Sequence, residues 1–404
     1  MSTLDDLRQV IRRIERRHAP RPAPEPLETI VGGTLLETDH GRVVLVRHDY
    51  PLAHRHGREK LEDAFLLSAD AMTLLARAGE ELVDPRGLVF VDVETTGLAG
   101  GTGTYAFLVG VGALEADRFV VTQYFMRDFD DEPALLAALE PRLAHASGVV
   151  TFNGSSFDLP LLETRFILAR RRWPVPLPHL DLVTPARRVW VRCFPDCRLA
   201  TLEREALGLE RADDVAGAFI PAIYFQFLRT RHARPLARVF AHNRDDVLSL
   251  VGVLAWLGRA LAADFPASAT PLELIGIGRL WERLDPDRSV ACYRGALDGG
   301  LSGWPWLWTC LRLAQWEKRR ARWNDACELW QRAVRSEIFD PRPWEELAKY
   351  HEHRGRDFAA AREIVSSAIA LARSTGAGSP VVDRFAYRLG RLERRLSALR
   401  RPGG

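Results

Sequence analysis

The sequence predicts a central α/β domain with a mixed sheet, followed by a separate all-α domain. In the middle of the chain, apolar and β-branched runs first follow one another directly and then alternate with helical stretches, which is typical of α/β domains. Beyond about residue 270 the strand-like runs disappear, and paired helical stretches take their place. The length of 404 residues is enough for two or three domains.

The composition is that of an ordinary globular protein. Hydrophobic residues make up 47% of the chain, and the net charge of +3 attracts a polyanion only weakly. The charged N-terminus lacks the apolar core of a signal peptide, and no run of about 18 apolar residues occurs. We therefore expect a cytoplasmic protein with no membrane partner. Cys193 and Cys197 lack further ligands at zinc spacing and are interpreted as reduced thiols.

Residues 1–85 are interpreted as an N-terminal extension. Residues 3–18 carry the apolar stripe of a basic amphipathic helix, and the proline-rich residues 19–26 form a linker after it. Two β-rich runs, TLLET and RVVLVRH, flank the turn-like sequence DHG and predict a small hairpin. A helical stretch near residues 60–79 leads into the next domain.

Residues 86–260 form the predicted α/β domain. The runs LVFVDVE, YAFLVGVGAL and FVVTQYFM, joined by glycine-rich or charged turns, predict three strands of one sheet. The helix EPALLAALEPRLA, the buried strand GVVTFN and the helix LPLLETRFILARR follow. Two further helical stretches, LATLEREALG and PLARVFAHNRDDVLSLVGVLAWLG, complete the domain.

Residues 270–400 predict a helical repeat domain. Small and apolar positions of one helix recur about 35 residues later, and this period resembles that of tetratricopeptide helical hairpins. Stacked hairpins bury surfaces that no single hairpin can bury, and they can present a concave surface to a protein partner or extend a nucleic-acid channel. The recurring positions are Ala326, Trp330, Ala333 and Val334, then Ala361, Val365, Ala368 and Ile369.

Two carboxylates interrupt the first strand of the α/β domain. Asp92 and Glu94 are two positions apart, so in a strand their side chains face the same side. Adjacent buried carboxylates repel each other and lose hydration, a cost that hard cations such as Mg²⁺ or Mn²⁺ offset. The alternative interpretation is an exposed strand end with solvated acids.

A third acid follows another predicted strand. The run FNGSSFDLP places Asn153 and Asp158 directly after that strand, with Asp158 at the start of a helix. In α/β proteins the carboxyl ends of strands are where sites assemble. Aspartate also caps helices well, so a capping role for Asp158 stays open.

A histidine and a fourth acid lie on a predicted helix. His242 and Asp246 are four positions apart and share one helical face, whereas Asp245 points elsewhere. Imidazole has an ordinary pKa of about 6.5, so His242 can act as a general base while Asp246 binds a cation. The alternative is a structural histidine.

Together these motifs resemble the DEDD superfamily of 3′-to-5′ exonucleases, and they come closest to its YprB-like ribonuclease-H-like branch. VDVETTG, FNGSSFDLP and HNRDDVLSL stand in the family's order within residues 86–258. The resemblance implies a ribonuclease-H-like mixed sheet flanked by helices, with the first three strands antiparallel. It also implies that two divalent ions, Mg²⁺ or Mn²⁺, are held by Asp92, Glu94, Asp158 and Asp246.

The resemblance also implies roles for two further residues. Asp181, in the sequence HLDL, would support the site. His242 would be the general base, although histidine-type members place that base five residues before the last aspartate and tyrosine-type members place it four before. His242 stands four residues before Asp246, in the tyrosine position.

The implied activity is metal-dependent 3′-to-5′ exonucleolytic hydrolysis of a nucleic acid, with a single-stranded 3′ end as the expected substrate. Two ions about 3.5–4 Å apart would activate a water and stabilise the leaving oxygen, releasing 5′-mononucleotides. Phe157 could stack on a base or pack in the core. The candidate substrate-binding residues are Thr95, Thr96, Gly97, Asn153 and Phe157.

Two other functions remain open on the sequence. One is a nucleic-acid-binding or protein-scaffolding protein in which the repeats do the main work and the nuclease-like domain is weak or inactive. The other is an endonuclease, which the close pairing of Asp92 with Glu94 and the late pair of His242 with Asp246 disfavour. The sequence does not separate DNA from RNA, because recognition of the 2′-hydroxyl depends on the shape of the pocket.

Overall fold

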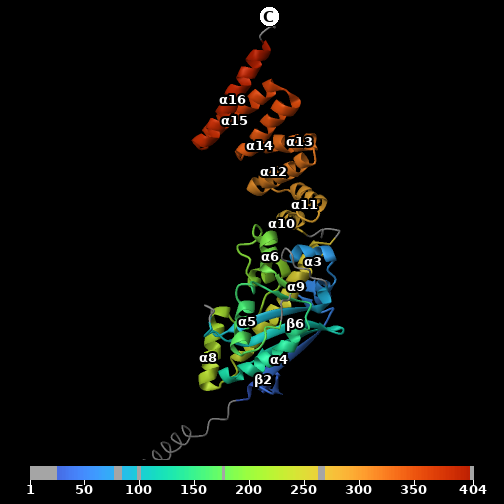
Figure 1. Cartoon of the computed structure of the whole chain (residues 1–404), viewed down its shortest axis with the longest axis vertical. Coiled ribbons are helices and arrows are strands. Elements are labelled where there is room, and N and C mark those ends of the chain that lie inside the picture. The colour runs from blue at the N-terminus through green and yellow to red at the C-terminus, as the bar shows by residue number, and fades with distance from the viewer. Residues whose placement is uncertain (1–24, 77–83, 98–101, 175–177, 263–268, 401–404) are drawn as a thin grey trace, which may run out of the picture. The chain divides into compact units, whose positions relative to one another are not determined.

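A computed structural model describes residues 25–76, 84–97, 102–174, 178–262 and 269–400. The chain forms two compact units, coloured by residue number in Figure 1. The predicted N-terminal helix of residues 3–18 lies outside the described residues. The first unit takes in residues 1–66, 76–182 and 202–256, and the second takes in residues 67–75, 183–201 and 257–404.

The first unit is built on a seven-stranded mixed sheet in the order β1-β2-β7-β6-β5-β8-β9. The three strands predicted to run antiparallel, β5, β6 and β7, do so, while β8 and β9 run parallel to β5. The predicted mixed sheet is therefore confirmed. The strands are β1 Thr34–Thr38, β2 Gly41–Pro51, β5 Leu88–Thr95, β6 Ala106–Glu115, β7 Arg118–Phe125, β8 Gly148–Thr151 and β9 His179–Asp181, and a separate pair consists of β3 Arg55–His56 and β4 Glu59–Lys60.

The predicted N-terminal hairpin is part of this sheet. Strand β2 pairs antiparallel with β7, from Val44 opposite Phe125 to Pro51 opposite Arg118. Pairing with β2 satisfies the backbone groups along the outer edge of β7, and the apolar residues of β2 are buried on the sheet. The interpretation of residues 1–85 as a separate extension therefore needs correction, because their hairpin belongs to the central sheet.

The helical stretch predicted near residues 60–79 is shorter and broken in the structure. It consists of the 3₁₀ helix η1 (Leu61–Phe65) and the helix α3 (Ala69–Leu75), which the division of the chain places in different units. Buried Leu61 and Phe65 anchor η1, and Phe65 lies against Phe90 of β5. Residues 77–79 lie outside the described part of the chain.

The helices of the first unit cover both faces of the sheet (Figure 1). Helix α4 packs against the face that carries Val89, Val91 and Val93, and α9 packs against the face that carries Asp92. Because successive residues of a strand point to opposite faces, Val89, Val91 and Val93 lie on the face of β5 opposite that of Asp92 and Glu94. The helices are α2 Leu27–Val31, α4 Glu132–Ala144, α5 Asp158–Leu168, α8 Ile220–Thr230 and α9 Leu236–Ala260, with a short π-helix, η4, at Glu203–Leu207.

Glycines in β6 let α9 approach the sheet closely. A Cβ atom on Gly110 would lie 2.4 Å from Oδ1 of Asn243, and one on Gly112 would lie 2.6 Å from Val247. Both Asn243 and Val247 are fully buried at 0% exposure. The two glycines therefore set the distance between α9 and the strands that carry the acids.

Gly110→Ala is expected to lower the free energy of unfolding by about 1–3 kcal/mol, because the added methyl group must displace Asn243 from a closely packed position. Chemical denaturation with urea measures this change. Gly103→Ala is the matched control, since a Cβ atom there meets nothing within 4 Å. Equal stability of the two variants would contradict the close packing described here.

The second unit is all helical within the described residues, with successive helices packed as neighbours. Helix α10 pairs with α11, α12 with α13, and α14 with α15. The recurring residues Ala326, Ala333, Ala361 and Ala368 are buried at these contacts. The tetratricopeptide assignment stays a prediction. The helices are α10 Pro271–Trp281, α11 Pro286–Asp298, α12 Gly303–Arg319, α13 Trp323–Val334, α14 Pro341–Tyr350, α15 Phe358–Ser374 and α16 Ser379–Arg400.

One segment of the predicted α/β domain packs with the helical unit instead. Helix α6 (Val183–Trp190) lies against α10, and the indole of Trp190 donates a hydrogen bond to Glu273 over 3.0 Å. Gly276 makes room for this contact, since a Cβ atom there would lie 2.3 Å from the Cα of Val189. The predicted domain of residues 86–260 is thus interrupted. Among the described helices, none combines the length and the apolar character needed to cross a membrane.

Candidate active site

Asp92 and Glu94 lie on the face of β5 that α9 covers. The side-chain amide of Asn243 on α9 donates hydrogen bonds to Asp92, 2.7 Å to Oδ2 and 3.1 Å to the backbone oxygen. Gln123 of β7 donates to Oδ1 of Asn243 over 2.8 Å, which fixes the orientation of that amide. A buried chain of hydrogen bonds thus holds Asp92 between a strand and a helix.

Asp158 enters the site from the turn after β8. It is the first residue of α5, where Phe157 holds the N-cap position and no side-chain capping bond forms. The capping alternative for Asp158 is therefore not what the structure shows. Asn153 has a positive φ of 65°, a conformation that asparagine tolerates, and lets the chain turn between strand and helix.

Asp181 of β9 holds this turn. Its carboxylate accepts hydrogen bonds from the backbone amides of Asn153 (2.7 Å) and Ser155 (3.1 Å) and from the Ser155 hydroxyl (2.5 Å). These contacts hold the turn that leads into Asp158, which gives the predicted supporting residue a defined structural contact.

Helix α9 contributes His242 and Asp246. The Nε2 atom of His242 lies 3.7 Å from Oδ2 of Asp246 and 3.9 Å from Oε1 of Glu94, so the imidazole points toward both acids. Oδ1 of Asp246 accepts a hydrogen bond of 2.5 Å from Arg211, which also pairs with Glu203. Asp245, by contrast, pairs with Arg244 at 2.7 Å.

Three of the four acids have a raised pKa. Burial raises the pKa of Asp92 well above its ordinary value, and the charges of neighbouring acids, Asp246 first, raise it further. Burial, with smaller effects of Asp246 and Asp158, raises the pKa of Glu94 to about 8. The pKa of Asp158 rises to about 7 through burial and the charge of Asp181. These buried carboxyl groups therefore retain their protons to higher pH than exposed acids do, unless a cation binds and favours their charged forms.

Burial and the neighbouring acids act against each other on the pKa of His242. Burial alone disfavours its charged form, but the carboxylates of Asp246, Glu94 and Asp214 outweigh burial and raise the pKa of His242 above its ordinary value. The imidazole is thus held among acids, and its side chain is 16% exposed.

The donor set suits a hard divalent cation, although the side chains are not gathered around one point. Across the described residues, no three His, Cys, Asp or Glu side chains form a group that could hold a metal ion. Asp246 bonds to Arg211 and Asp92 bonds to Asn243 instead. All four candidate ligands present oxygen, and their mutual repulsion is what a divalent cation relieves. The binding of two ions stays a prediction.

A family model and a relative match parts of this chain. Residues 89–258 match the model of a family described as the RNase H superfamily. The "Uncharacterized protein YprB" of Bacillus subtilis (strain 168) is 30% identical over 362 residues, which cover 87% of this chain and 85% of that protein. The chain belongs to the YprB family. Its RNase H superfamily domain indicates nuclease-type activity on nucleic acid, and nucleases of this superfamily generally use divalent metal ions.

A cavity of about 670 Å³ opens beside the acids of the RNase H superfamily domain. Glu94 and Asp158 line it together with three predicted substrate-binding residues, Thr95, Gly97 and Phe157. The other two predicted residues do not line it. The Thr96 hydroxyl accepts a hydrogen bond of 2.9 Å from the Tyr105 backbone, and Asn153 forms the turn described above.

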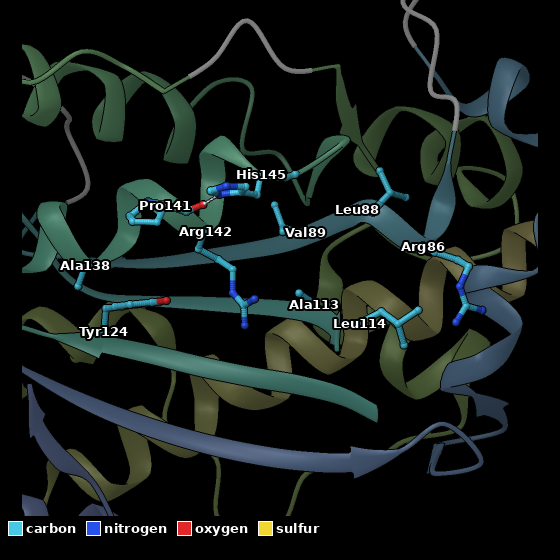
Figure 2. Close-up of a pocket in the computed structure, with 12 residues that line it drawn as sticks. Arg86, Leu88, Val89, Ala113, Leu114, Tyr124, Ala138, Pro141, Arg142 and His145 are labelled. Carbon is cyan, nitrogen blue, oxygen red and sulfur yellow. Dashed lines mark hydrogen bonds between the residues drawn. The ribbon is translucent and has the colours of Figure 1, made fainter. Parts of the chain in front are cut away.

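A second cavity, of about 410 Å³, lies elsewhere on the domain (Figure 2). Val89 and Ala113 line it from the sheet and Pro141 and Arg142 from α4, so it opens on the sheet face opposite that of Asp92. Its lining contains none of the candidate acids of this site. In this relative of YprB, the candidate acids Asp92 and Glu94 lie on the other face of the sheet.

Sequence reasoning missed three side chains that contact the acids and His242. Asn243 stands beside His242 in the third motif. Its position on the buried face of α9 is the feature from which a contact with the sheet could have been predicted. Arg211 and Asp214 lie in the loop before α8 and bond to Asp246 and His242. Loop residues follow no helical or strand period, so the sequence offered no means of placing these two.

Proposed function

We propose that the chain is a metal-dependent 3′-to-5′ exonuclease. The observation that carries this proposal is the collection of Asp92, Glu94, Asp158 and Asp246 from three separate segments onto one face of an RNase H superfamily sheet. Buried acids that repel one another destabilise the fold unless cations neutralise them. Such clusters are typical of functional sites rather than of structural cores.

The four carboxylates are the proposed ligands of two divalent ions, Mg²⁺ or Mn²⁺. When bound, such ions would lower the pKa of a water and stabilise the oxygen that leaves phosphorus. Asp92 and Glu94 would bind from the strand, and Asp158 and Asp246 from the two helices. Arg211 occupies Oδ1 of Asp246, so Oδ2, which faces His242, is the oxygen best placed for a ligand.

His242 is the proposed general base. Its Nε2 atom lies within 4 Å of both Glu94 and Asp246, where a water held by either carboxylate is within reach of the ring. The base takes the proton of that water as the oxygen attacks phosphorus. The bond from phosphorus to the 3′ oxygen of the preceding nucleotide breaks, that oxygen keeps the electron pair and takes a proton from solvent, and a 5′-mononucleotide is released.

The terminal nucleotide is proposed to occupy the cavity beside Glu94 and Asp158. Phe157 lies on the cavity wall and is 56% exposed, which is unusual for phenylalanine and suits stacking on a base. Thr95 and Gly97 line the same cavity. A cavity of about 670 Å³ is large enough for one nucleotide.

Phe157→Ala is expected to raise KM for a single-stranded oligonucleotide about 10-fold, because base stacking on an aromatic ring contributes about 1–3 kcal/mol. The expected change in stability is below about 0.5 kcal/mol, since the ring is exposed. Steady-state kinetics and thermal unfolding measure the two effects. Ile167→Ala is the control, because Ile167 on α5 is 61% exposed and does not line the cavity. An unchanged KM in Phe157→Ala would count against this placement of the nucleotide.

A second candidate function rests on the contact of Arg211 with Asp246. A guanidinium bonded to one candidate ligand, together with the absence of a three-ligand group among the described residues, favours a nucleic-acid-binding or scaffolding protein whose nuclease-like domain is weak or inactive. In that case the helical unit, through a protein partner or nucleic acid, would carry the main function.

Three single-stranded substrates separate these functions. One is labelled at the 3′ end, one at the 5′ end, and one is circular; each is made as DNA and as RNA. With Mn²⁺ or Mg²⁺, the exonuclease releases the 3′ label at once as a mononucleotide, shortens the 5′-labelled strand stepwise and leaves the circle intact. Cleavage of the circle would identify an endonuclease, and binding without cleavage of any substrate would favour the second candidate.

A further inference from the structure

We propose that Asp214 is a positioning residue that holds the His242 imidazole with its Nε2 atom turned toward Glu94 and Asp246. This inference deepens the proposed nuclease function and rests on it. Oδ1 of Asp214 lies 2.8 Å from Nδ1 of His242, the shortest contact of that ring with any carboxylate in the described residues. Asp214 lies outside the three sequence motifs, in the loop before α8.

The hydrogen bond to Asp214 determines which ring nitrogen carries the proton. An ionised carboxylate has no hydrogen to donate, so the Nδ1 atom of His242 must be the donor in this contact. In the neutral imidazole the second nitrogen then has a lone pair and no hydrogen. Asp214 therefore selects the tautomer in which Nε2 is able to accept a proton.

The same bond sets the direction of the ring. With Nδ1 held by Asp214, Nε2 points to the opposite side, 3.9 Å from Glu94 and 3.7 Å from Asp246. Rotation of the ring by half a turn would place a carbon atom against Asp214 and break the bond. Arg211 also approaches Nδ1, but at 3.4 Å this contact is longer than the bond to Asp214 and does not replace it.

Asp214 is itself fixed by its loop. The backbone amide of Val215 donates to Oδ1 of Asp214 over 2.8 Å. The Arg238 guanidinium donates to the backbone oxygens of Asp213 (3.1 Å) and Asp214 (2.8 Å). Arg238 and His242 are both on α9 and one turn apart, so the helix that carries the histidine also holds the loop that orients it. The carboxylate is thus positioned before substrate arrives.

Asp214→Asn tests this proposal through kinetics. Asparagine keeps the shape of aspartate, but its amide can donate to Nδ1 and favour the wrong tautomer. We expect kcat to fall about 10- to 100-fold, a common effect of removing a residue that orients a catalytic group. KM and the affinity for Mn²⁺, measured by calorimetry, are expected to change less than about 3-fold. Asp245→Asn is the control, because Asp245 pairs with Arg244 and faces away from the ring.

A double mutant distinguishes positioning of His242 from a direct or structural role. If Asp214 acts through the imidazole, Asp214→Asn has no further effect on kcat once His242 is replaced with alanine. An equal fall in kcat with and without the imidazole would overturn the proposal. Asp214→Glu, which retains an ionised carboxylate, is expected to recover part of the lost rate.

A measurement independent of activity separates this proposal from the proposed function. Nitrogen NMR of ¹⁵N-histidine-labelled protein, recorded at rising pH until the His242 signals stop shifting and the ring is neutral, reports which nitrogen carries hydrogen, and His242→Gln assigns the signal. We expect hydrogen on Nδ1 in the wild type and on Nε2 in Asp214→Asn. Hydrogen on Nε2 in the wild type would overturn the proposal. An inactive wild type with the expected tautomer would overturn the nuclease function and retain the positioning role.

Discussion

Exchange of Asp92 for asparagine is expected to reduce nuclease activity by about 10³-fold or more, which corresponds to about 4 kcal/mol of transition-state stabilisation. Asparagine is almost identical in shape and can still accept the hydrogen bond from Asn243, so the fold is retained. Its neutral amide binds divalent cations more weakly than a carboxylate. The rate of release of a 3′-terminal mononucleotide with Mn²⁺ measures the loss.

The same substitution is expected to stabilise the protein when metal is chelated. Asp92 is an acid placed among other acids, and asparagine cannot acquire the charge whose repulsion and loss of hydration disfavour the folded state as pH rises. We expect Tm in EDTA at pH 8 to rise by about 3–8 °C. Asp245→Asn is the control, with activity within about 3-fold of the wild type. Full activity in Asp92→Asn, or a lower Tm in EDTA, would contradict the assigned role of Asp92.

In the absence of divalent metal, stability is expected to fall as pH rises from about 5 to 9. The pKa of Glu94 is raised from 4.5 to about 8, and that of Asp158 from 3.8 to about 7. The native state therefore retains protons that the unfolded chain has already released. This contribution to stability is complete below pH 4 and is lost as pH passes through 7 and 8. The raised pKa of His242 acts in the same direction.

Thermal unfolding in EDTA at several pH values measures this loss, which we expect to lower Tm by about 5–10 °C between pH 6 and pH 9. Addition of Mn²⁺ is expected to restore more stability at pH 8 than at pH 5.5, because metal and protons compete for the same carboxylates. Glu94→Gln supplies the control and should flatten the pH dependence. A Tm that rises with pH in EDTA would show that these acids are already neutralised within the protein.

The sequence predicted the central sheet and the residues of the candidate site more closely than it predicted the boundaries of the units. Strand alternation placed Asp92 and Glu94 on one face, and helical spacing placed His242 beside Asp246. Both inferences use local geometry that a strand or helix imposes wherever it packs. The antiparallel direction of the first three strands was implied by the family resemblance, and the structure confirms it.

The remaining features depend on contacts between distant segments. The bond between His242 and Asp214 joins residues 28 positions apart, and the bond between Asp246 and Arg211 joins residues 35 positions apart. The hairpin of residues 34–51 pairs with β7, although its own sequence predicts only that it is a hairpin. Where a strand pairs depends on which sheet edge remains open, and that property belongs to the whole fold.

The pairing of β2 with β7 has a practical consequence for work with the nuclease domain alone. A protein shortened to begin at residue 86, the boundary that the sequence suggests, would lose β2 and leave the whole outer edge of β7 without a partner. A long apolar strand with an open edge recruits strands from other molecules, and the result is precipitation or fibre growth. A soluble fragment must therefore retain residues 34–51, so the N-terminal region limits where this chain can be divided.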